Sequence, residues 1–144
     1  MTTKPPRDIA AYPFRTHTET RFQDLDPLGH LNNVAIAALF ENGRVRFNQS
    51  LGLTHAPGTR WLIARVEIDY VAEGFFPEAV EIASGIGRVG NSSWQIVSAA
   101  FQEKGCVATS VTTLVLTNKD GSLPMDDAMR AVLAANMVEG SAEG

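Results

Sequence analysis

One segment, residues 33–51, constrains the fold more than any other, because it carries the one strong helix signal in the chain. An asparagine precedes its apolar start, and Gly52 followed by Leu53 is a typical helix ending. About eighteen residues at 1.5 Å per residue make a helix roughly 27 Å long. Its first half, residues 34–40, is apolar on all sides, which predicts burial on most sides. The rest of the chain must therefore wrap this helix.

Runs typical of β-strands make up most of the remaining sequence. One run with polar and β-branched alternation covers residues 14–22, and four more follow the helix, at 61–71, 79–88, 93–103 and 106–117. Short turns separate consecutive runs, which predicts antiparallel connections. A short last helix is expected over about 125–136. The order indicates an α+β domain in which a five-stranded antiparallel sheet curls around the long helix.

The length of 144 residues predicts one domain. We expect a flexible arm over residues 1–13, the domain over 14–137, and a disordered tail over 138–144. Charged residues make up only 19% of the sequence, below the roughly 25% of average soluble domains. Such a low content indicates surface hidden either in a membrane or between subunits.

The membrane alternative fails on length. The longest uncharged stretches, 89–102 and 105–118, have 14 residues each, whereas a spanning helix needs about 20. Residues 1–13 lack the apolar segment of a signal peptide, so we expect a cytoplasmic protein. With the membrane excluded, the low charge content indicates surface buried in a homo-oligomer. The net charge of −4 argues against nucleic acid as a partner.

Cysteine and histidine are too sparse for a metal site or a disulfide. Cys106 is the single cysteine, and His17, His30 and His55 are widely spaced.

Residues 85–90 match the glycine pattern of dinucleotide-binding loops. That pattern needs a helix directly after it, whereas a turn and a strand follow here, so we expect a bulged hairpin instead. We expect no cofactor and no metal.

The informative segment is the loop that leads into the long helix. It brings together two carboxylates, one imidazole and two amides: Asp24, Asp26, His30, Asn32 and Asn33. A helix N-terminus offers free N–H donors and partial positive charge, which can stabilise a developing oxyanion. A carboxylate beside it can act as a nucleophile or activate water. Each residue taken alone is typical of a turn or a helix cap, but the whole cluster favours chemistry.

This loop and the helix after it resemble the hot-dog-fold acyl-CoA thioesterases of the 4-hydroxybenzoyl-CoA thioesterase type. The similarity is carried by Asp24-x-Asp26-x-x-Gly29-His30-Leu31-Asn32-Asn33, then Phe40-Glu41-x-x-Arg44-x-x-Phe47 and Leu51-Gly52. Weaker likeness extends from about residue 14 to 135. The resemblance implies a hot-dog fold and pairing of sheets edge to edge into homodimers or homotetramers with active sites between subunits.

The resemblance also implies roles for individual residues. Asp26 matches the loop aspartate that attacks the thioester or activates water, and the backbone N–H of Asn33 matches the oxyanion donor. Gly29 would allow a close turn, while His30 and Asn32 would position water, thioester or carboxylate.

Other hot-dog thioesterases place the working carboxylate on the helix, where Glu41 is the matching residue. A pair between Glu41 and Arg44, three positions apart on the helix, would instead make Glu41 structural, so we favour Asp26. Arg65 is a candidate substrate-binding cation, with Arg60, Arg88 and Lys104 as further candidates for phosphate contacts.

The expected function is hydrolysis of an acyl-CoA or acyl carrier protein thioester to free acid and thiol. The alternative, from a different class, is a non-catalytic acyl-CoA-binding or assembly protein of the same fold. Hot-dog dehydratases need a differently placed histidine motif, which this sequence lacks.

Overall fold

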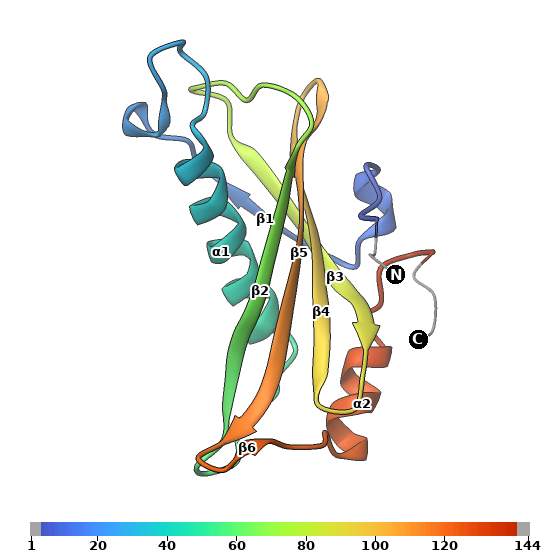
Figure 1. The fold of residues 1–144 in the computed structure, drawn as a ribbon. Coiled ribbons are helices and arrows are strands. Elements are labelled where there is room, and N and C mark those ends of the chain that lie inside the picture. Colours follow the sequence, from blue (N-terminus) through green and yellow to red (C-terminus); the bar gives the residue numbers. More distant parts are fainter. Residues whose placement is uncertain (1–3, 141–144) are drawn as a thin grey trace.

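The computed structural model describes residues 4–140 and contains one long helix and one curled sheet (Figure 1). The long helix is α1 (Asn33–Ser50), and α2 (Asp127–Ala134) follows the sheet. The strands are β1 (Phe14–Thr18), β2 (Arg60–Tyr70), β3 (Val80–Val89), β4 (Ser93–Gln102) and β5 (Gly105–Asn118). The predicted α+β architecture is confirmed. A short β6 (Gly121–Ser122) beside β5 was not predicted.

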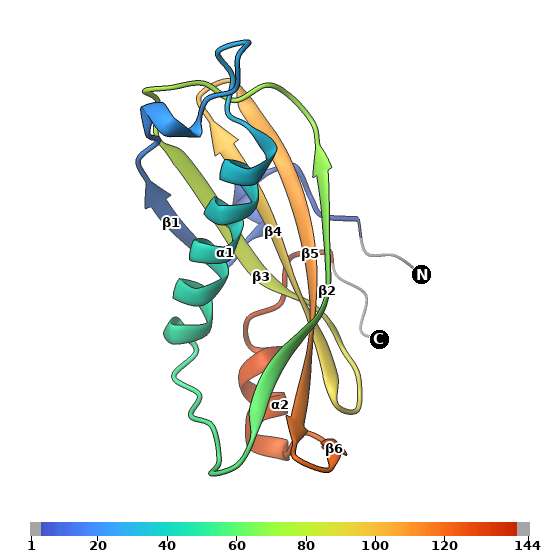
Figure 2. The same cartoon turned by 60° about the vertical axis from the view of Figure 1, so that its left-hand side comes forward.

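The strand order of the sheet is β1-β3-β4-β5-β2, with every neighbouring pair antiparallel. Figure 2 shows the sheet twisting past α1, with α2 near one end of the strands. No helix among residues 4–140 is both long and apolar enough to cross a membrane. The two edges differ, because β1 has five residues and β2 has 11.

The buried face of α1 packs on the inner face of the sheet. Ile36, Leu39 and Phe40 join a cluster with strand residues such as Ile82, and Phe47 anchors a second cluster near α2. Gly43 is needed at the closest approach, because a Cβ built there would lie 2.5 Å from Cγ2 of Ile82. The absence of a side chain at Gly43 therefore lets α1 pack closely against Ile82 of β3.

The opposite face of α1 is open in the single chain, which corrects the expectation of burial on most sides. Val34 is 72% exposed and Val45 is 49% exposed, and Ala37 and Ala38 are also exposed. The edge strand β2 shows the same pattern, with Leu62, Ile63, Val66 and Tyr70 all exposed. Two elements that follow one another in the chain, α1 and β2, thus leave apolar side chains uncovered.

Arg44 does not form the expected ion pair with Glu41. Its guanidinium turns into the domain and donates from Nη1 to Oγ1 of Thr112 on β5, at 3.2 Å, while Glu41 is exposed. Burial lowers the pKa of Arg44, and the charge of Glu41 partly offsets this. A structural role of Glu41 through a pair with Arg44 is therefore not supported.

Both ends of the described chain pack on the outer face of the sheet. Residues 9–11 form a short 3-10 helix, and Tyr12 is buried, with its hydroxyl donating to the Pro6 carbonyl at 2.6 Å. Val138 is buried beside Tyr12, and the Glu139 N–H donates to the Ala11 carbonyl. The parts of the expected arm and tail within 4–140 thus make ordered contacts; residues 1–3 and 141–144 lie outside the described residues.

The glycine-rich segment at 85–90 belongs to a hairpin, as predicted. The pairing of β3 with β4 shifts register between Ile86 and Val89, which marks a bulge, and the next strand begins at Ser93. A strand rather than a helix follows the glycines, so they do not form a dinucleotide loop.

Candidate active site

Asp26 organises the loop before α1. Its Oδ1 accepts hydrogen bonds from the backbone N–H groups of Leu28 (2.9 Å) and His30 (3.1 Å), while its own N–H donates to the His30 carbonyl (2.8 Å). Gly29 has φ of 84°, the left-handed conformation that glycine adopts without strain. Oδ2 of Asp26 has no hydrogen-bond partner among residues 4–140. One carboxylate oxygen therefore holds the loop, and the other is available.

Asp24 has a purely structural position. It is 5% exposed, and its carboxylate accepts from the side chain of Arg21, with Nη2 at 2.8 Å from Oδ1. These hydrogen bonds lower the pKa of Asp24. The Asp24 carbonyl also accepts the Asn32 N–H at 2.7 Å, which ties the two ends of the loop together.

The start of α1 is capped by Asn32, whose Oδ1 accepts the Ala35 N–H at 2.7 Å. The Ile36 N–H bonds to the Asn32 carbonyl. Within residues 4–140, the N–H groups of Asn33 and Val34 are left without a hydrogen-bond partner. These are the two donors at the positive end of an 18-residue helix. The position is suited to a negatively charged oxygen.

His30 contacts the connection between β2 and β3, a contact that was not predicted from the sequence. Its Nε2 lies 3.1 Å from Oε2 of Glu73, and its ring meets the Phe75 ring edge-on, with centroids 5.5 Å apart. Both partners lie between β2 and β3. The only sequence signal for them is a pair of aromatic residues, Phe75 and Phe76, in a turn.

Glu41 and Arg65 lie away from this cluster within one chain. Glu41 is exposed, eight residues beyond Asn33, which is about 12 Å along a helix axis. Arg65 is exposed on β2, with Nε 3.5 Å from Oε1 of Glu67. The structure thus gathers Asp26, Gly29, His30, Asn32 and Asn33, and leaves Glu41 and Arg65 apart.

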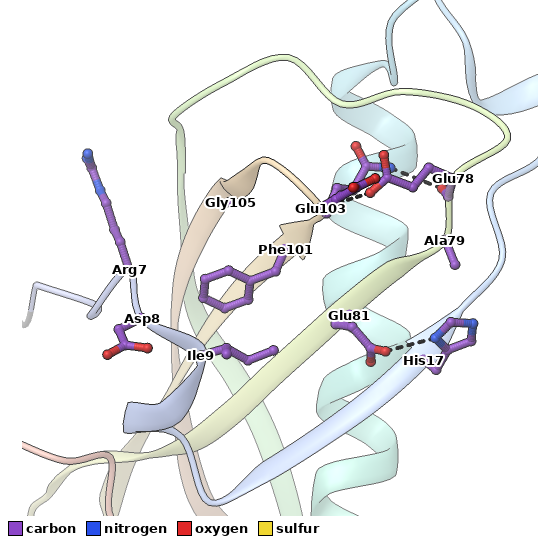
Figure 3. Close-up of a pocket in the computed structure, with 11 residues that line it drawn as sticks. Arg7, Asp8, Ile9, His17, Glu78, Ala79, Glu81, Phe101, Glu103 and Gly105 are labelled. Carbon is purple, nitrogen blue, oxygen red and sulfur yellow. Dashed lines mark hydrogen bonds and ion pairs between the residues drawn. The ribbon is translucent and has the colours of Figure 1, made fainter.

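Four cavities are formed by the described residues, and the gathered residues line none of those four. The largest of them, about 630 Å³, lies on the outer face of the sheet beside residues 7–9. Figure 3 shows Glu81 and His17 pointing toward one another there, joined by a 2.8 Å contact near Ile9 and Phe101. Among residues 4–140, no three His, Cys, Asp or Glu side chains are grouped to hold a metal ion.

Comparison with known families decides the class of the chain. The family model of the thioesterase-like superfamily matches residues 20–133, which include the loop, α1 and the whole sheet after it. The chain belongs to this superfamily. No curated protein matches the sequence.

Several solved structures share the fold of this superfamily member. A thioesterase from Thermus thermophilus, in complex with coenzyme A and zinc, is 27% identical with a TM-score of 0.76, over 87% of this chain and 94% of that one. A predicted thioesterase from Bacillus stearothermophilus is 28% identical with a TM-score of 0.77, over 88% and 97%. The PA5185 protein of Pseudomonas aeruginosa is 29% identical with a TM-score of 0.75, over 93% and 96%. The hot-dog fold expected from the sequence is confirmed for this thioesterase-like chain.

Proposed function

We propose that this chain hydrolyses an acyl-CoA or acyl carrier protein thioester to a free acid and a thiol, with Asp26 as the working carboxylate. The observation that carries the proposal is the pairing of functions in one loop. Among the described residues, Oδ2 of Asp26 has no hydrogen-bond partner, and neither have the N–H groups of Asn33 and Val34 at the start of the helix seven residues later. Membership of the thioesterase-like superfamily supports it.

In the proposed reaction the thioester carbonyl oxygen accepts the N–H of Asn33, where the helix stabilises the negative charge that develops on it. Asp26 then acts in one of two ways. It attacks the carbonyl carbon and forms a mixed anhydride that water hydrolyses, or it takes a proton from a water that attacks directly. In both, the carbon–sulfur bond breaks, and the leaving thiolate is protonated.

His30 and Asn32 support this chemistry from the backbone and the side chain. The His30 N–H orients the Asp26 carboxylate, and its ring stands beside Phe75. Asn32 holds the helix start, so that the Asn33 N–H stays free. Gly29 allows the turn between them. Glu41, exposed on α1, is the alternative carboxylate.

We propose further that the site is completed by a second copy of the chain. Exposed apolar side chains lie both on β2 and on the open face of α1, and an apolar edge strand of 11 residues needs a cover. Pairing β2 with the β2 of another copy would cover it and extend the sheet. Coenzyme A bound to the Thermus thermophilus relative supports coenzyme A as the carrier. Arg65, on β2, would then lie near the interface.

The experiment is an assay of the wild-type protein over a panel of acyl- and aryl-CoA thioesters, alongside Asp26→Asn. The asparagine keeps an acceptor oxygen for Leu28 and His30, so the loop should stay intact while kcat falls by about 100-fold or more. Asp120→Asn, in the exposed turn before β6, is the matched control and should keep full activity. Wild-type rates in Asp26→Asn, or loss of activity only in Glu41→Gln, would overturn the assignment.

The second candidate function is binding without turnover. The hydrogen bonds that the Asp26 carboxylate accepts within its own turn favour it, because such Asx turns serve structure in many loops. Tight acyl-CoA binding with no hydrolysis across the panel would establish it.

A further inference from the structure

The connection between β2 and β3, residues 71–79, is fastened to the candidate active site. The Leu31 N–H donates to the Gly74 carbonyl at 2.9 Å, and His30 meets Glu73 and Phe75. Gly74 also packs on Leu31, because a Cβ there would lie 2.8 Å from Cδ1 of that leucine. Figure 1 shows this connection running across one end of the molecule, between the loop before α1 and the β4–β5 hairpin.

On its other side the connection is held by Gln102, the last residue of β4. The Phe75 N–H donates to Oε1 of Gln102 at 2.9 Å, and Nε2 of Gln102 donates to the carbonyls of Phe75 (2.8 Å) and Glu78 (3.0 Å). One amide side chain thus satisfies three backbone groups. The backbone of Phe75 is held in place while the residue stays 39% exposed. A fixed, exposed aromatic ring beside a candidate catalytic loop is a surface prepared for a ligand.

A cavity of about 560 Å³ lies against this ring, between the connection and the β4–β5 hairpin. Lys104, in the hairpin turn, lines the cavity and places its Nζ 5.8 Å from the centroid of Phe75. The Phe75 ring therefore contacts both the His30 ring and the Lys104 ammonium group. Two residues of the cavity lining, Glu73 and Phe75, contact His30, and Lys104 supplies a cation to the same lining.

Three glutamates also line the cavity, and two of them are engaged. Glu73 faces His30, and a carboxylate oxygen of Glu78 accepts the Glu103 N–H. Glu103 has an exposed side chain, next in sequence to Lys104. Among the described residues, Lys104 is the one cation in the lining of this cavity.

We propose that this cavity holds the phosphopantetheine arm of the thioester, with Phe75 against the pantetheine chain and Lys104 against its phosphate. The inference rests on the proposed function and names the residues that hold the carrier. An uncharged chain that ends in one phosphate matches an exposed ring followed by one cation. Phosphopantetheine is common to coenzyme A and acyl carrier protein, so either carrier would present the same chemistry.

The test compares three thioesters of one acyl group: the CoA thioester, the acyl carrier protein thioester, and the pantetheine thioester that lacks the phosphate. Lys104→Ala should lower kcat/KM for the phosphate-bearing thioesters by about three- to tenfold and weaken its salt dependence. It should leave the pantetheine thioester unchanged. Phe75→Ala should lower kcat/KM for all three, and Glu103→Gln should raise it for the phosphate-bearing ones.

Lys119→Ala, in the turn after β5, is the matched control, because it removes the same charge away from the cavity. A loss with the CoA thioester alone assigns the carrier to coenzyme A, and a loss with both carriers assigns the shared arm. An unchanged kcat/KM in Lys104→Ala with both carriers, or an equal loss with the pantetheine thioester, overturns the inference. Hydrolysis of the pantetheine thioester by the wild type tests the proposed function separately.

Discussion

The imidazole Nε2 of His30 lies 3.1 Å from Oε2 of Glu73, across the gap between the loop before α1 and the connection after β2. The two residues are far apart in sequence, and their contact joins the candidate catalytic loop to a segment that presents an aromatic ring to solvent. The pair involves an exposed carboxylate, so its contribution to stability is small, about 0–1 kcal/mol. We expect the contact to matter instead for the orientation of the loop before α1.

His30→Ala tests this orientation. The backbone N–H that bonds to Asp26 is kept, so the loop should persist, and the free energy of unfolding should change by less than about 1 kcal/mol. We expect kcat to fall about tenfold, because the ring no longer holds the loop against Glu73 and Phe75. Steady-state kinetics and urea unfolding measure the two effects. An unchanged kcat would reduce His30 to a structural residue.

Gly43→Ala tests the close packing of α1 on β3. An added Cβ would lie 2.5 Å from Cγ2 and 3.0 Å from Cβ of Ile82, so α1 or β3 must shift. The better helix propensity of alanine stabilises the folded state by about 1 kcal/mol, which offsets part of the cost of this overlap. We expect the free energy of unfolding to fall by about 1–2 kcal/mol in total. Urea unfolding of Gly43→Ala in an Ile82→Ala background is the control, since the smaller side chain leaves room. Equal losses in both backgrounds would contradict the overlap.

The ion pair between Asp24 and Arg21 should make the stability of the protein depend on pH. The hydrogen bonds from Arg21 lower the pKa of Asp24 in the folded protein, so the ionised carboxylate stabilises the fold above the ordinary aspartate pKa of about 3.9. This contribution, about 1 kcal/mol, is lost as the pH falls below about 4. Asp24→Asn should therefore be less stable than the wild type at pH 7, with a smaller difference at pH 3. Urea unfolding at both values would show it, and a constant difference would argue against the pair.

Val66→Glu tests the proposed pairing through β2. Val66 is 46% exposed in the single chain, and a carboxylate buried at a symmetric interface should raise the dissociation constant by about 100-fold or more. Sedimentation should show monomers at micromolar concentration, and thioesterase activity should fall with them. Arg15→Glu, on the other edge of the sheet, is the control and should leave the assembly intact. A wild-type protein that sediments as a monomer would reject the pairing.

Elements built from local patterns were predictable from the sequence. The boundaries of α1 follow from Asn32 and Gly52, which act within one turn of the helix. The run expected over 14–22 ends early, at Thr18, because a 3-10 turn begins at Phe22 and Thr20 bonds to the Glu78 carbonyl instead. Distant contacts of that kind leave no local trace.

The candidate site divides in the same way. Asp26 and Asn33 could be placed together because one short loop joins them, so their proximity is a local property. Phe75, Gln102 and Lys104 were not predicted to meet, since their contacts depend on how the sheet brings a connection against a hairpin. The open face of α1 was not predicted either. An apolar pattern indicates that side chains are buried, but it does not indicate whether the same chain or another one buries them.

The hydrogen bond from Glu139 to Ala11, with Val138 against Tyr12, joins the two ends of the described chain, so we expect them to open together. Neither segment can fray alone without exposing the apolar side chains of the other. Amide hydrogens in both segments, such as those of Tyr12 and Val138, which bond to Ile9 and Ile86, should therefore exchange with solvent in the same opening event. A protease that cuts near one end should therefore release the other end as well. Segments from opposite ends of the sequence together cover this part of the outer face of the sheet.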